Sequence, residues 1–318
     1  TMTSPENWRP TTTPELLVAR AGLLKDIREF FSSLGILEVE TPLISAAGNT
    51  DPEIHSIRTD TGAYLRTSPE FALKRLLAAG SGDIFELGRV FRAGESGRSH
   101  NPEFTLLEWY RTGYSYHRLM DEIAVLVRLC GRGKFNQWPE ERLSYRQLFQ
   151  RHLDIDPFSA DEKDLCAVAG KNGISDIELD RRQWLDLLIS HVIQPALPAQ
   201  GLTFVYDFPA DQAALARIRP ETPPLAERFE LYLGCTELAN GYQELTDAIE
   251  QKRRFEAENT ERQKRGKPVY TIDQHLIAAL EHGLPDCAGV ALGVDRLLMA
   301  ICGVETISEV TAFPFSRA

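Results

Sequence analysis

The segment from Phe91 to Tyr110 constrains the fold of this chain more than any other. It joins two stretches of β-prone residues through a polar loop, in which two glycines and an Asn-Pro pair provide the turn chemistry. The spacing predicts an antiparallel hairpin with strands over 84–91 and 104–110. Because successive side chains of a strand point to opposite faces, alternate residues of the second strand should share one face. These residues are Phe104, Leu106, Glu108 and Tyr110.

The predicted hairpin also carries residues suited to binding a small charged ligand. Arg92 stands at the end of the first strand, His100 and Asn101 lie in the loop, and the second strand carries a carboxylate. A carboxylate on such a strand is costly to bury unless a cation or a hydrogen-bond donor meets it. The pattern therefore predicts a site that holds a triphosphate and an amine together. The alternative is a solvated hairpin tip that carries a few charges.

Composition restricts the kind of partner that the chain can bind. It has 318 residues, of which 43% are hydrophobic and 25% charged, and its formal net charge is -11. These values are ordinary for a folded protein with a sizeable core. An acidic chain is a poor match for wide contact with a phosphate backbone, which needs clustered lysine and arginine. Any nucleotide is therefore expected to be small and locally bound.

The cysteines and the apolar runs bear on location. The five cysteines form neither a C-x-x-C pair nor a metal-ligand spacing, so a reducing cytoplasm is the simplest location. No apolar run approaches the length that spans a membrane, and no membrane partner is expected.

The first strong helical pattern runs from Leu16 to Leu34, and Gly35 follows where a C-terminal cap is expected. It predicts a long amphipathic helix. The next residues, 36–42, predict a short strand that Pro42 ends. Because proline cannot donate to a strand ladder, this strand should lie at a sheet edge or an interface, where it can pair with a copy of itself.

A second helix is predicted over 71–79. Ser68 is expected as its N-cap, Pro69 at its first position and Glu70 in its first turn. These are the residue types that helix starts favour, because they satisfy free backbone N–H groups or suit the positive end of the helix dipole.

Residues 115–200 differ in character from the rest of the chain. They contain helical patterns separated by polar connectors, over 119–129, 145–153 and 184–193. Strand patterns return from Phe204. We therefore predict a single α+β domain over 1–318, in which an antiparallel sheet is flanked by helices and residues 115–200 form a helical insertion.

Another candidate site lies near the end of the sequence. The run from Gly289 to Arg296 predicts a strand that ends in glycines and leads into a helix over 297–301. Backbone donors, the positive end of the helix dipole and the Arg296 guanidinium would then meet in one place, which suits an anion. The run is neither a dinucleotide-binding loop nor a lysine-bearing phosphate loop, and a structural glycine turn explains it equally well.

Carboxylates crowd the segment 229–247, which has strand character and an Asn-Gly turn. They would repel one another unless cations intervene. Magnesium accepts one or two carboxylates together with phosphate oxygens, which is the pattern expected around ATP. Solvated acidic residues on a hairpin are the alternative, but the apolar context of Glu237 and Glu244 favours a site.

Three segments match, in order, the three motifs of the class II aminoacyl-tRNA synthetases, which the chain therefore resembles. They are the helix and strand that end at Pro42, the arginine hairpin over 91–110, and the strand and helix over 289–301. Within that family, the strings HNPEFTLLEWY and ELANGYQELTD resemble the lysyl-tRNA synthetase branch, and the likeness covers nearly the whole chain. The resemblance implies the class II catalytic fold.

Lysyl-tRNA synthetases carry an anticodon-reading barrel before the first motif, whereas here the first-motif helix begins by Leu16. We expect no anticodon-binding domain and no anticodon recognition. The chain is more similar to the truncated paralogues that attach β-lysine to a lysine of elongation factor P. This resemblance implies an ATP-dependent ligase that activates (R)-β-lysine or lysine as an aminoacyl-adenylate, acts on elongation factor P, uses Mg²⁺, and forms a homodimer through the first motif.

The resemblance also implies roles for single residues. Arg92 and Arg296 are expected as catalytic residues, on the α-phosphate and the terminal phosphates respectively. Glu237 is expected to bind Mg²⁺, with Glu230 assisting. The other ATP-binding residues would be Ala93, Gly94, His100, Asn101, Phe104, Leu238 and Gly293, alongside both arginines and Glu237. The lysine-like substrate, whose amines need acidic or hydroxyl partners, would contact Ser68, Pro69, Glu70, Tyr110, Asn240 and Glu244.

Two positions depart from the family pattern. Ala291 stands where lysyl-tRNA synthetases usually have glycine, and its extra methyl group narrows the pocket, which favours a β-amino over an α-amino acid. Gly94 stands where the family has an acidic residue. Glu95 lies one place further and would point away from the site unless Gly94 allows a bulge.

Two other functions stay open. The chain is alternatively a lysine-activating enzyme that charges tRNA or another small amine, or a noncatalytic nucleotide-binding regulator. The presence of both arginines, Glu237 and Glu244 argues against the regulator. The base that deprotonates the attacking amine is also open, because Glu244 and a phosphate oxygen are both candidates.

Overall fold

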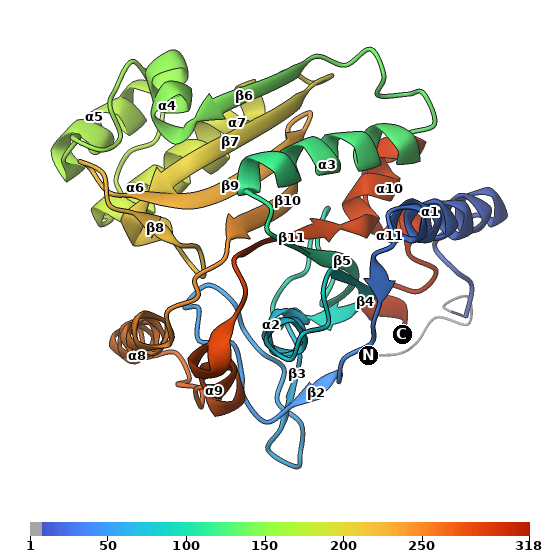
Figure 1. The fold of residues 1–318 in the computed structure, drawn as a ribbon. Helices are drawn as coiled ribbons and strands as arrows, with labels where there is room; N and C mark the ends of the chain where they lie inside the picture. Colours follow the sequence, from blue (N-terminus) through green and yellow to red (C-terminus); the bar gives the residue numbers. More distant parts are fainter. Residues whose placement is uncertain (1–7) are drawn as a thin grey trace.

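The computed structural model describes residues 8–318, which fold around one mixed sheet of nine strands. The strand order is β1-β4-β5-β11-β10-β9-β7-β6, with β8 beside β9, and β2 and β3 form a separate pair (Figure 1). The strands are β1 (Leu37–Glu38), β2 (Ile44–Ser45), β3 (Tyr64–Leu65), β4 (Ile84–Phe91), β5 (Glu103–Thr112), β6 (Glu140–Ser144), β7 (Leu202–Pro209), β8 (Ile218–Arg219), β9 (Leu225–Leu233), β10 (Thr236–Gln243) and β11 (Cys287–Gly293).

Helices cover the sheet on both sides, which confirms the predicted α+β class. The α-helices are α1 (Pro14–Ser33), α2 (Glu70–Ala78), α3 (Tyr116–Cys130), α4 (Tyr145–Leu153), α5 (Glu162–Lys171), α6 (Arg181–Leu188), α7 (Gln194–Ala196), α8 (Ala248–Lys264), α9 (Gln274–Gly283), α10 (Val294–Cys302) and α11 (Ile307–Val310). The short helices are η1 (Ile189–Ile193), which is a π-helix, and the 3₁₀ turns η2 (Ala210–Gln212) and η3 (Phe315–Arg317).

The sheet is antiparallel through its centre and parallel at both edges. Strand β1 pairs in parallel with β4, and β6 pairs in parallel with β7, while the strands between them are antiparallel. The prediction of an edge strand before Pro42 is therefore confirmed, although β1 is only two residues long. The prediction of an antiparallel sheet holds for the strands that carry the candidate site.

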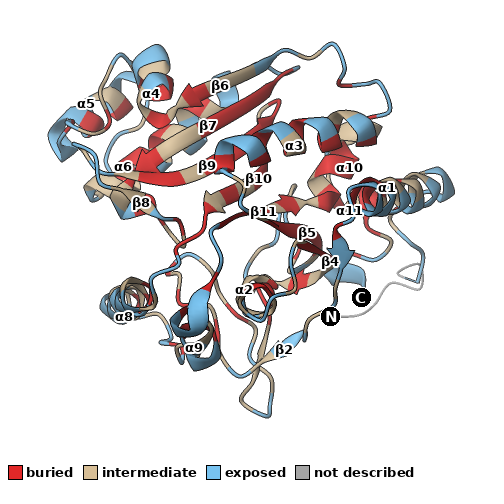
Figure 2. Ribbon diagram, in the orientation of Figure 1, coloured by how far each residue is buried: buried red, intermediate tan, exposed pale blue. Residues whose placement is uncertain are grey.

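The predicted hairpin is β4 and β5, and its two faces differ as expected. Leu107 and Trp109 are fully buried in the main core, where α1, α3 and α10 cover the sheet (Figure 2). The alternate residues, from Phe104 to Tyr110, line a cavity on the opposite face. Helix α2 packs on this opposite face, and its contacts with α9 place α9 there too.

Helix α2 begins differently from the prediction. Pro69 occupies the cap position without a side-chain cap bond, and the helix starts at Glu70. Ser68 lies one residue earlier, where its Oγ accepts a hydrogen bond from the Glu70 N–H (3.0 Å) and donates one to Glu108 Oε2 (2.6 Å). Pro69 is therefore the N-cap in place of Ser68. The Ser68 hydroxyl instead links the start of the helix to β5.

Within residues 115–200, the elements belong to two different cores. Helix α3 packs in the main core, and β6 is an edge strand of the main sheet that the helical pattern did not indicate. Helices α4, α5 and α6 form a second core against β7 and β9. The helical insertion over 115–200 stays a prediction, and α4 to α6 are the part of it that forms this second core.

Helices α8 and α9 lie outside the predicted elements. The sequence of α8 is polar nearly all round, and its buried residues are only Gln251, Phe255 and Arg262. A helix without an apolar stripe gives no periodic signal. In the part of the chain that the structure describes, no helix combines the length and the apolar character needed to cross a bilayer.

We expect Phe31→Ala to destabilise the fold by about 3–5 kcal/mol, because a cavity replaces a fully buried ring. The Phe31 ring stacks on Phe85 with centroids 4.4 Å apart and meets Trp109 edge-on at 5.3 Å. Urea unfolding followed by tryptophan fluorescence measures the loss. Val18→Ala, on the exposed side of the same helix, should change stability by less than about 0.5 kcal/mol. Equal losses for the two variants would contradict this account of the core.

Candidate active site

A cavity of about 880 Å³ lies over the face of β5, β11 and β10. It is also lined by residues of the 49–54 loop and of helices α6, α8 and α10. Most residues predicted for the site line this one cavity. They are Ser68, Glu70, Arg92, His100, Asn101, Phe104, Tyr110, Glu237, Leu238, Asn240, Glu244, Gly293 and Arg296. The others, Pro69, Ala93, Gly94 and Glu230, do not line it.

Small residues of β11 form the floor between larger residues of its neighbours. Gly289 is paired with Tyr110 on one side and Tyr242 on the other, and Ala291 lies between Glu108 and Asn240. A Cβ atom on Gly289 would come within 2.3 Å of the Tyr110 ring. The missing side chain therefore leaves the space in which the flanking polar groups converge.

A β-bulge brings Glu237 to the cavity. The register between β10 and β9 shifts between Glu237 and Ala239, so that Glu237 is paired with Tyr232 while Asn240 is paired with Glu230. Without the extra residue, Glu237 and Asn240 would lie on opposite faces of the strand. The bulge thus places both on the cavity side, whereas Ala239 is buried in the main core.

Three carboxylates from different elements meet at one end of the cavity. Glu70 comes from the start of α2, Glu108 from β5, and Glu244 from the residue after β10. Glu108 accepts hydrogen bonds from the hydroxyls of Ser68 (2.6 Å) and Tyr110 (2.8 Å). Burial raises the pKa of Glu108 to about 8 and that of Glu244 to about 7. We name this group, with Lys74, the acidic pocket.

Lys74 is the cation of the acidic pocket. Its Nζ lies 2.6 Å from Glu70 Oε1 and 2.6 Å from Glu244 Oε2, the second as an ion pair without hydrogen-bond geometry. Burial alone would lower the pKa of Lys74, but the charges of Glu244 and Glu70 outweigh it and raise the pKa. Lys74 therefore stays protonated, and one oxygen of each partner remains available.

Arginines mark the other end of the cavity. The Arg92 guanidinium lies 5.1 Å from the centre of the Phe104 ring, and its Nη1 is 3.5 Å from Glu95 Oε1. Arg296 donates from Nη1 to the Glu237 carbonyl (2.8 Å) and from Nη2 to His100 Nε2 (2.7 Å). Such an arrangement suits an aromatic base beside phosphates.

His100 accepts from Arg296 as a neutral ring. Burial lowers its pKa, and the nearby charges of Arg296 and Arg92 lower it further against the opposing effect of Glu95. A neutral imidazole can accept at Nε2 only when its proton is on Nδ1. His100 therefore orients Arg296 without adding a positive charge.

The backbone conformation of Gly94 explains how Glu95 can reach the cavity although position 94 lacks the acidic residue of the family. Gly94 has a φ of 80°, in the left-handed region that glycine adopts without strain. The chain turns there, and Glu95 lines the cavity next to Arg92. An acidic group is thus present on the cavity side one position later than in the family pattern.

The carboxylates of Glu237 and Glu230 differ in whether their oxygens already accept hydrogen bonds. Glu230 Oε1 receives Arg228 Nη2 and Oε2 receives the Tyr232 hydroxyl, each at 2.6 Å. Among residues 8–318, no hydrogen bond or ion pair reaches the Glu237 carboxylate, whose pKa is raised by burial and by Glu230. Glu237 therefore fits a magnesium ligand, whereas the oxygens of Glu230 are already engaged.

No group of three or more His, Cys, Asp or Glu side chains within residues 8–318 is arranged to hold a metal ion by itself. This is compatible with Mg²⁺, which is usually bound through one or two carboxylates and substrate phosphates. The donor set of the site therefore fits a nucleotide-bound magnesium and not a permanent metal centre.

The asparagines of the site have different surroundings. Asn101 donates from Nδ2 to the Glu103 carbonyl (2.6 Å) and accepts from the Phe315 N–H (3.0 Å), which fixes the segment after α11. The buried Oδ1 of Asn240 has no hydrogen-bond partner among the described residues. An orphaned acceptor facing a cavity is expected to meet a ligand donor.

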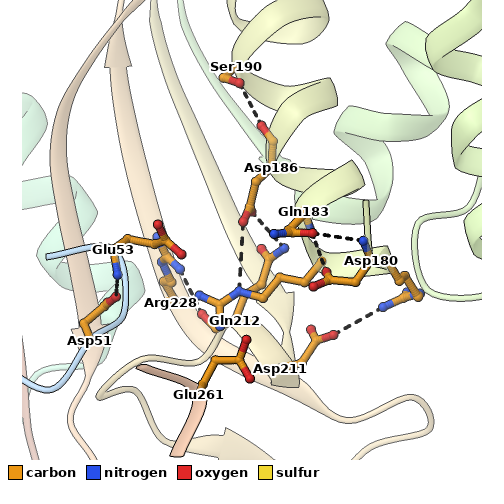
Figure 3. A network of polar contacts seen from close by, with 12 residues as sticks. Asp51, Glu53, Asp180, Gln183, Asp186, Ser190, Asp211, Gln212, Arg228 and Glu261 are labelled. Carbon is orange, nitrogen blue, oxygen red and sulfur yellow. Dashed lines mark hydrogen bonds and ion pairs between the residues drawn. The ribbon is translucent and has the colours of Figure 1, made fainter. Parts of the chain in front are cut away.

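The outer wall of the cavity is formed by α6, η2, α8 and the 51–54 loop (Figure 3). Gln212 donates to Asp186 Oδ1 (3.2 Å), and Arg228 donates to the Gln212 carbonyl (2.8 Å). Partial burial raises the pKa of Asp186 to about 6. Glu53 and Glu261 also lie on this wall. Arg265 lines the same cavity and pairs with both of them, Nη1 with Glu53 Oε1 (2.6 Å) and Nε with Glu261 Oε1 (2.6 Å), so the charges of these two carboxylates are balanced on the wall itself.

The sequence matches the family of class II tRNA synthetases specific for D, K and N over residues 7–317. The chain belongs to this family. It is 50% identical to the Elongation factor P--(R)-beta-lysine ligase of Yersinia enterocolitica, with 100% of both chains covered. The ligases of the same name from Vibrio cholerae and Klebsiella pneumoniae are each 49% identical, with 98% and 100% of this chain covered and 99% and 100% of theirs.

Membership confirms that the sheet and helices form a class II synthetase domain. It also confirms the resemblance that the hairpin and the two matched strings indicated. The roles of the single residues stay predictions, and their gathering in one cavity supports them.

Glu108 lines the cavity and Lys74 pairs with two of the carboxylates that line it, but neither was among the predicted site residues. Glu108 had a signal, because strand alternation placed it on the face of Tyr110. Lys74 follows Glu70 by four residues, a spacing that usually indicates a solvated ion pair on a helix surface. Nothing in that spacing shows that the lysine is buried.

We expect Gly289→Ala to weaken binding of lysine at least about tenfold, because the new methyl group must displace Tyr110 or Glu244. Its Cβ would lie 2.4 Å from Glu244 Oε1. Isothermal titration with lysine measures the loss, and ATP binding should be retained. Gly97→Ala, where a Cβ meets nothing within 4 Å, is the matched control. Unchanged lysine affinity in Gly289→Ala would show that ligand does not occupy this floor.

Proposed function

We propose that this protein is an ATP-dependent ligase that activates (R)-β-lysine as an aminoacyl-adenylate and transfers it to a lysine side chain of elongation factor P. Relatives that are about half identical over their full length carry that name. The observation that carries the proposal is the polarity of the cavity. Two buried carboxylates, Glu108 and Glu244, and the partly buried Glu70 lie at one end and two arginines at the other, as a diamino acid and a nucleotide require.

In the first step, a carboxylate oxygen of the amino acid attacks the α-phosphorus of ATP and pyrophosphate leaves. Arg92 is proposed to hold the carboxylate and the α-phosphate, and Arg296 the terminal phosphates. Phe104 would stack on the adenine. Catalysis by such a site is alignment together with neutralisation of charge in the transition state. Mg²⁺, held by Glu237 and phosphate oxygens, would supply part of that neutralisation.

In the second step, the acceptor amine attacks the carbonyl carbon of the adenylate, and the bond to the phosphate oxygen breaks to release AMP. An ordinary lysine amine has a pKa of about 10.4, so it must lose a proton before it attacks. Glu244 and a phosphate oxygen of the adenylate both remain candidates for the base.

The methyl group of Ala291 supports the β-amino acid. Ala291 is paired with Glu108 and Asn240, so it lies on the cavity floor between two groups that would bind the substrate. A methyl group there takes space that a glycine would leave to the substrate backbone. The preference for (R)-β-lysine over lysine is part of the proposal.

The test is ATP–pyrophosphate exchange with (R)-β-lysine and lysine side by side, followed by intact-mass measurement of elongation factor P. We expect (R)-β-lysine to support exchange at the lower concentration and elongation factor P to gain one β-lysyl group. Glu244→Gln should lower kcat/KM at least about a hundredfold, since it removes a buried charge partner of the substrate.

Other results would favour the alternatives. Charging of tRNA without a mass change in elongation factor P would favour a tRNA or small-amine acceptor. Nucleotide binding without amino-acid-dependent exchange would favour a noncatalytic regulator.

We further propose a homodimer in the cytoplasm. Large apolar side chains between α1 and β2 are exposed to solvent, and single ones are unremarkable, but a group of them marks an interface. They are Leu34, Leu37, Leu43 and Ile44. The first motif of the family includes this segment. All five cysteines are unpaired, which suits a reducing compartment.

Replacing Leu37 and Ile44 by glutamate should dissociate the dimer, because buried charges without partners are costly at an interface. Sedimentation velocity of both proteins over a concentration series measures the change. Val125→Glu places the same charge on α3, whose exposed side lies elsewhere, and should leave the dimer intact. A wild-type protein that sediments as a monomer at every concentration would refute this interface.

A further inference from the structure

We propose that Lys74 is a positioning residue that sets the charge of the acidic pocket and thereby selects a substrate with two amines. The inference rests on the proposed function, because it takes the substrate to be a diamino acid. Lys74 would act through Glu70 and Glu244 without contacting the reacting atoms.

The geometry of Lys74 is unusual for a lysine. Its side chain is 2% exposed, and lysines are rarely buried unless they are paired. Helix α2 carries it four residues after Glu70, and its Nζ also reaches Glu244 on the far side of the pocket. A single ammonium thus holds Glu70 Oε1 and Glu244 Oε2. The buried Glu244 Oε1 accepts no hydrogen bond of good geometry from the described residues, and only the backbone of Gly289 lies against it.

The charge of the pocket follows from these contacts. Glu70, Glu108 and Glu244 contribute three negative charges when ionised, and Lys74 contributes one positive charge, which leaves a surplus of two negative charges. Two ammonium groups of a diamino acid balance that surplus. An amino acid with one amine would leave one carboxyl of the pocket protonated and without a cationic partner, so it would gain one charge-assisted contact fewer. Without Lys74, a diamino acid would itself leave one carboxylate unpaired.

Other titratable groups near Glu244 do not change this balance. The groups that face it from the packed elements are Glu70 and Lys74 on α2, Glu108 and Tyr110 on β5, Tyr242 on β10 and Cys287 on β11. Burial raises the pKa of both tyrosines and of the cysteine thiol, so these three stay neutral near pH 7. The charge is therefore set by the three carboxylates and Lys74.

The sign of the pH dependence follows. Because burial raises the pKa of Glu244 to about 7 and that of Glu108 to about 8, both carboxyls of the ligand-free pocket lose their protons as pH rises through this range. A substrate ammonium favours the ionised form, so binding releases a proton and strengthens as pH rises through the pKa. Lys74 lowers the pKa of Glu244 against the effect of burial. Removing Lys74 should therefore move the rise in affinity to higher pH.

The experiment uses the full chain with Lys74→Met and measures the KM for (R)-β-lysine in ATP–pyrophosphate exchange between about pH 6 and pH 9. At pH 7 we expect KM to rise at least about tenfold and the midpoint of its pH dependence to move up by about one unit. The kcat and the KM for ATP should stay within about twofold, since the arginine end is unchanged.

Two variants accompany this measurement. Lys74→Arg keeps the positive charge and should keep the wild-type midpoint. Lys25→Met removes an exposed lysine of α1 and should match the wild type throughout. If Lys74→Met does not fold, Lys74→Gln, which also lacks the charge but keeps a polar end, is used for the same measurement.

An unchanged midpoint in the neutral variants would overturn the inference, even if KM rose equally at every pH, because that pattern indicates only a structural role. A midpoint that moved equally in Lys74→Arg would also overturn it. If the wild type showed no ATP–pyrophosphate exchange that depends on the amino acid, both the proposed function and the role of Lys74 would be wrong. Exchange in the wild type with an unshifted midpoint in Lys74→Met would refute the role of Lys74 alone.

Discussion

The register of β5, β11 and β10 is the constraint on which the candidate site depends. Antiparallel pairing fixes which side chains stand next to each other on one face, and a slip of one residue would turn every one of them to the core. Pairing of Gly289 with Tyr110 and Tyr242 puts the smallest residue in the middle of the floor. The bulge at β10 then adds Glu237 to the same face.

This arrangement gives one cavity with two chemically opposite ends. The carboxylates of the acidic pocket lie on α2, on β5 and directly after β10, whereas Arg92 directly follows β4 and Arg296 lies in the first turn of α10. At one end Lys74 pairs with Glu70 and Glu244, and at the other His100 accepts a hydrogen bond from Arg296. Both ends thus keep capacity for a ligand.

The parts of this site that could be predicted are those with local signals. Strand alternation placed Phe104 and Tyr110 on one face, and turn chemistry placed the hairpin. What failed depends on contacts between distant segments. Ser68, which was expected as the N-cap of α2, lies one residue before the cap and donates to Glu108 on β5. The burial of Lys74 depends on how α2 packs against the sheet. The spacing of residues in the sequence does not indicate how a helix packs against a distant strand.

The acidic pocket also relates ligand binding to the stability of the fold. Burial raises the folded-state pKa of Glu108 to about 8 and of Glu244 to about 7, above the value of about 4.3 for an exposed glutamate. Protonation of these groups therefore stabilises the folded chain fully below the unfolded pKa, and that contribution is lost as pH rises through the folded values. At neutral pH, the empty pocket holds protons where a diamino acid would place its ammonium groups. A diamino acid that binds to the ionised carboxyls therefore displaces these protons, so its affinity and the stability of the fold depend on pH through the same groups.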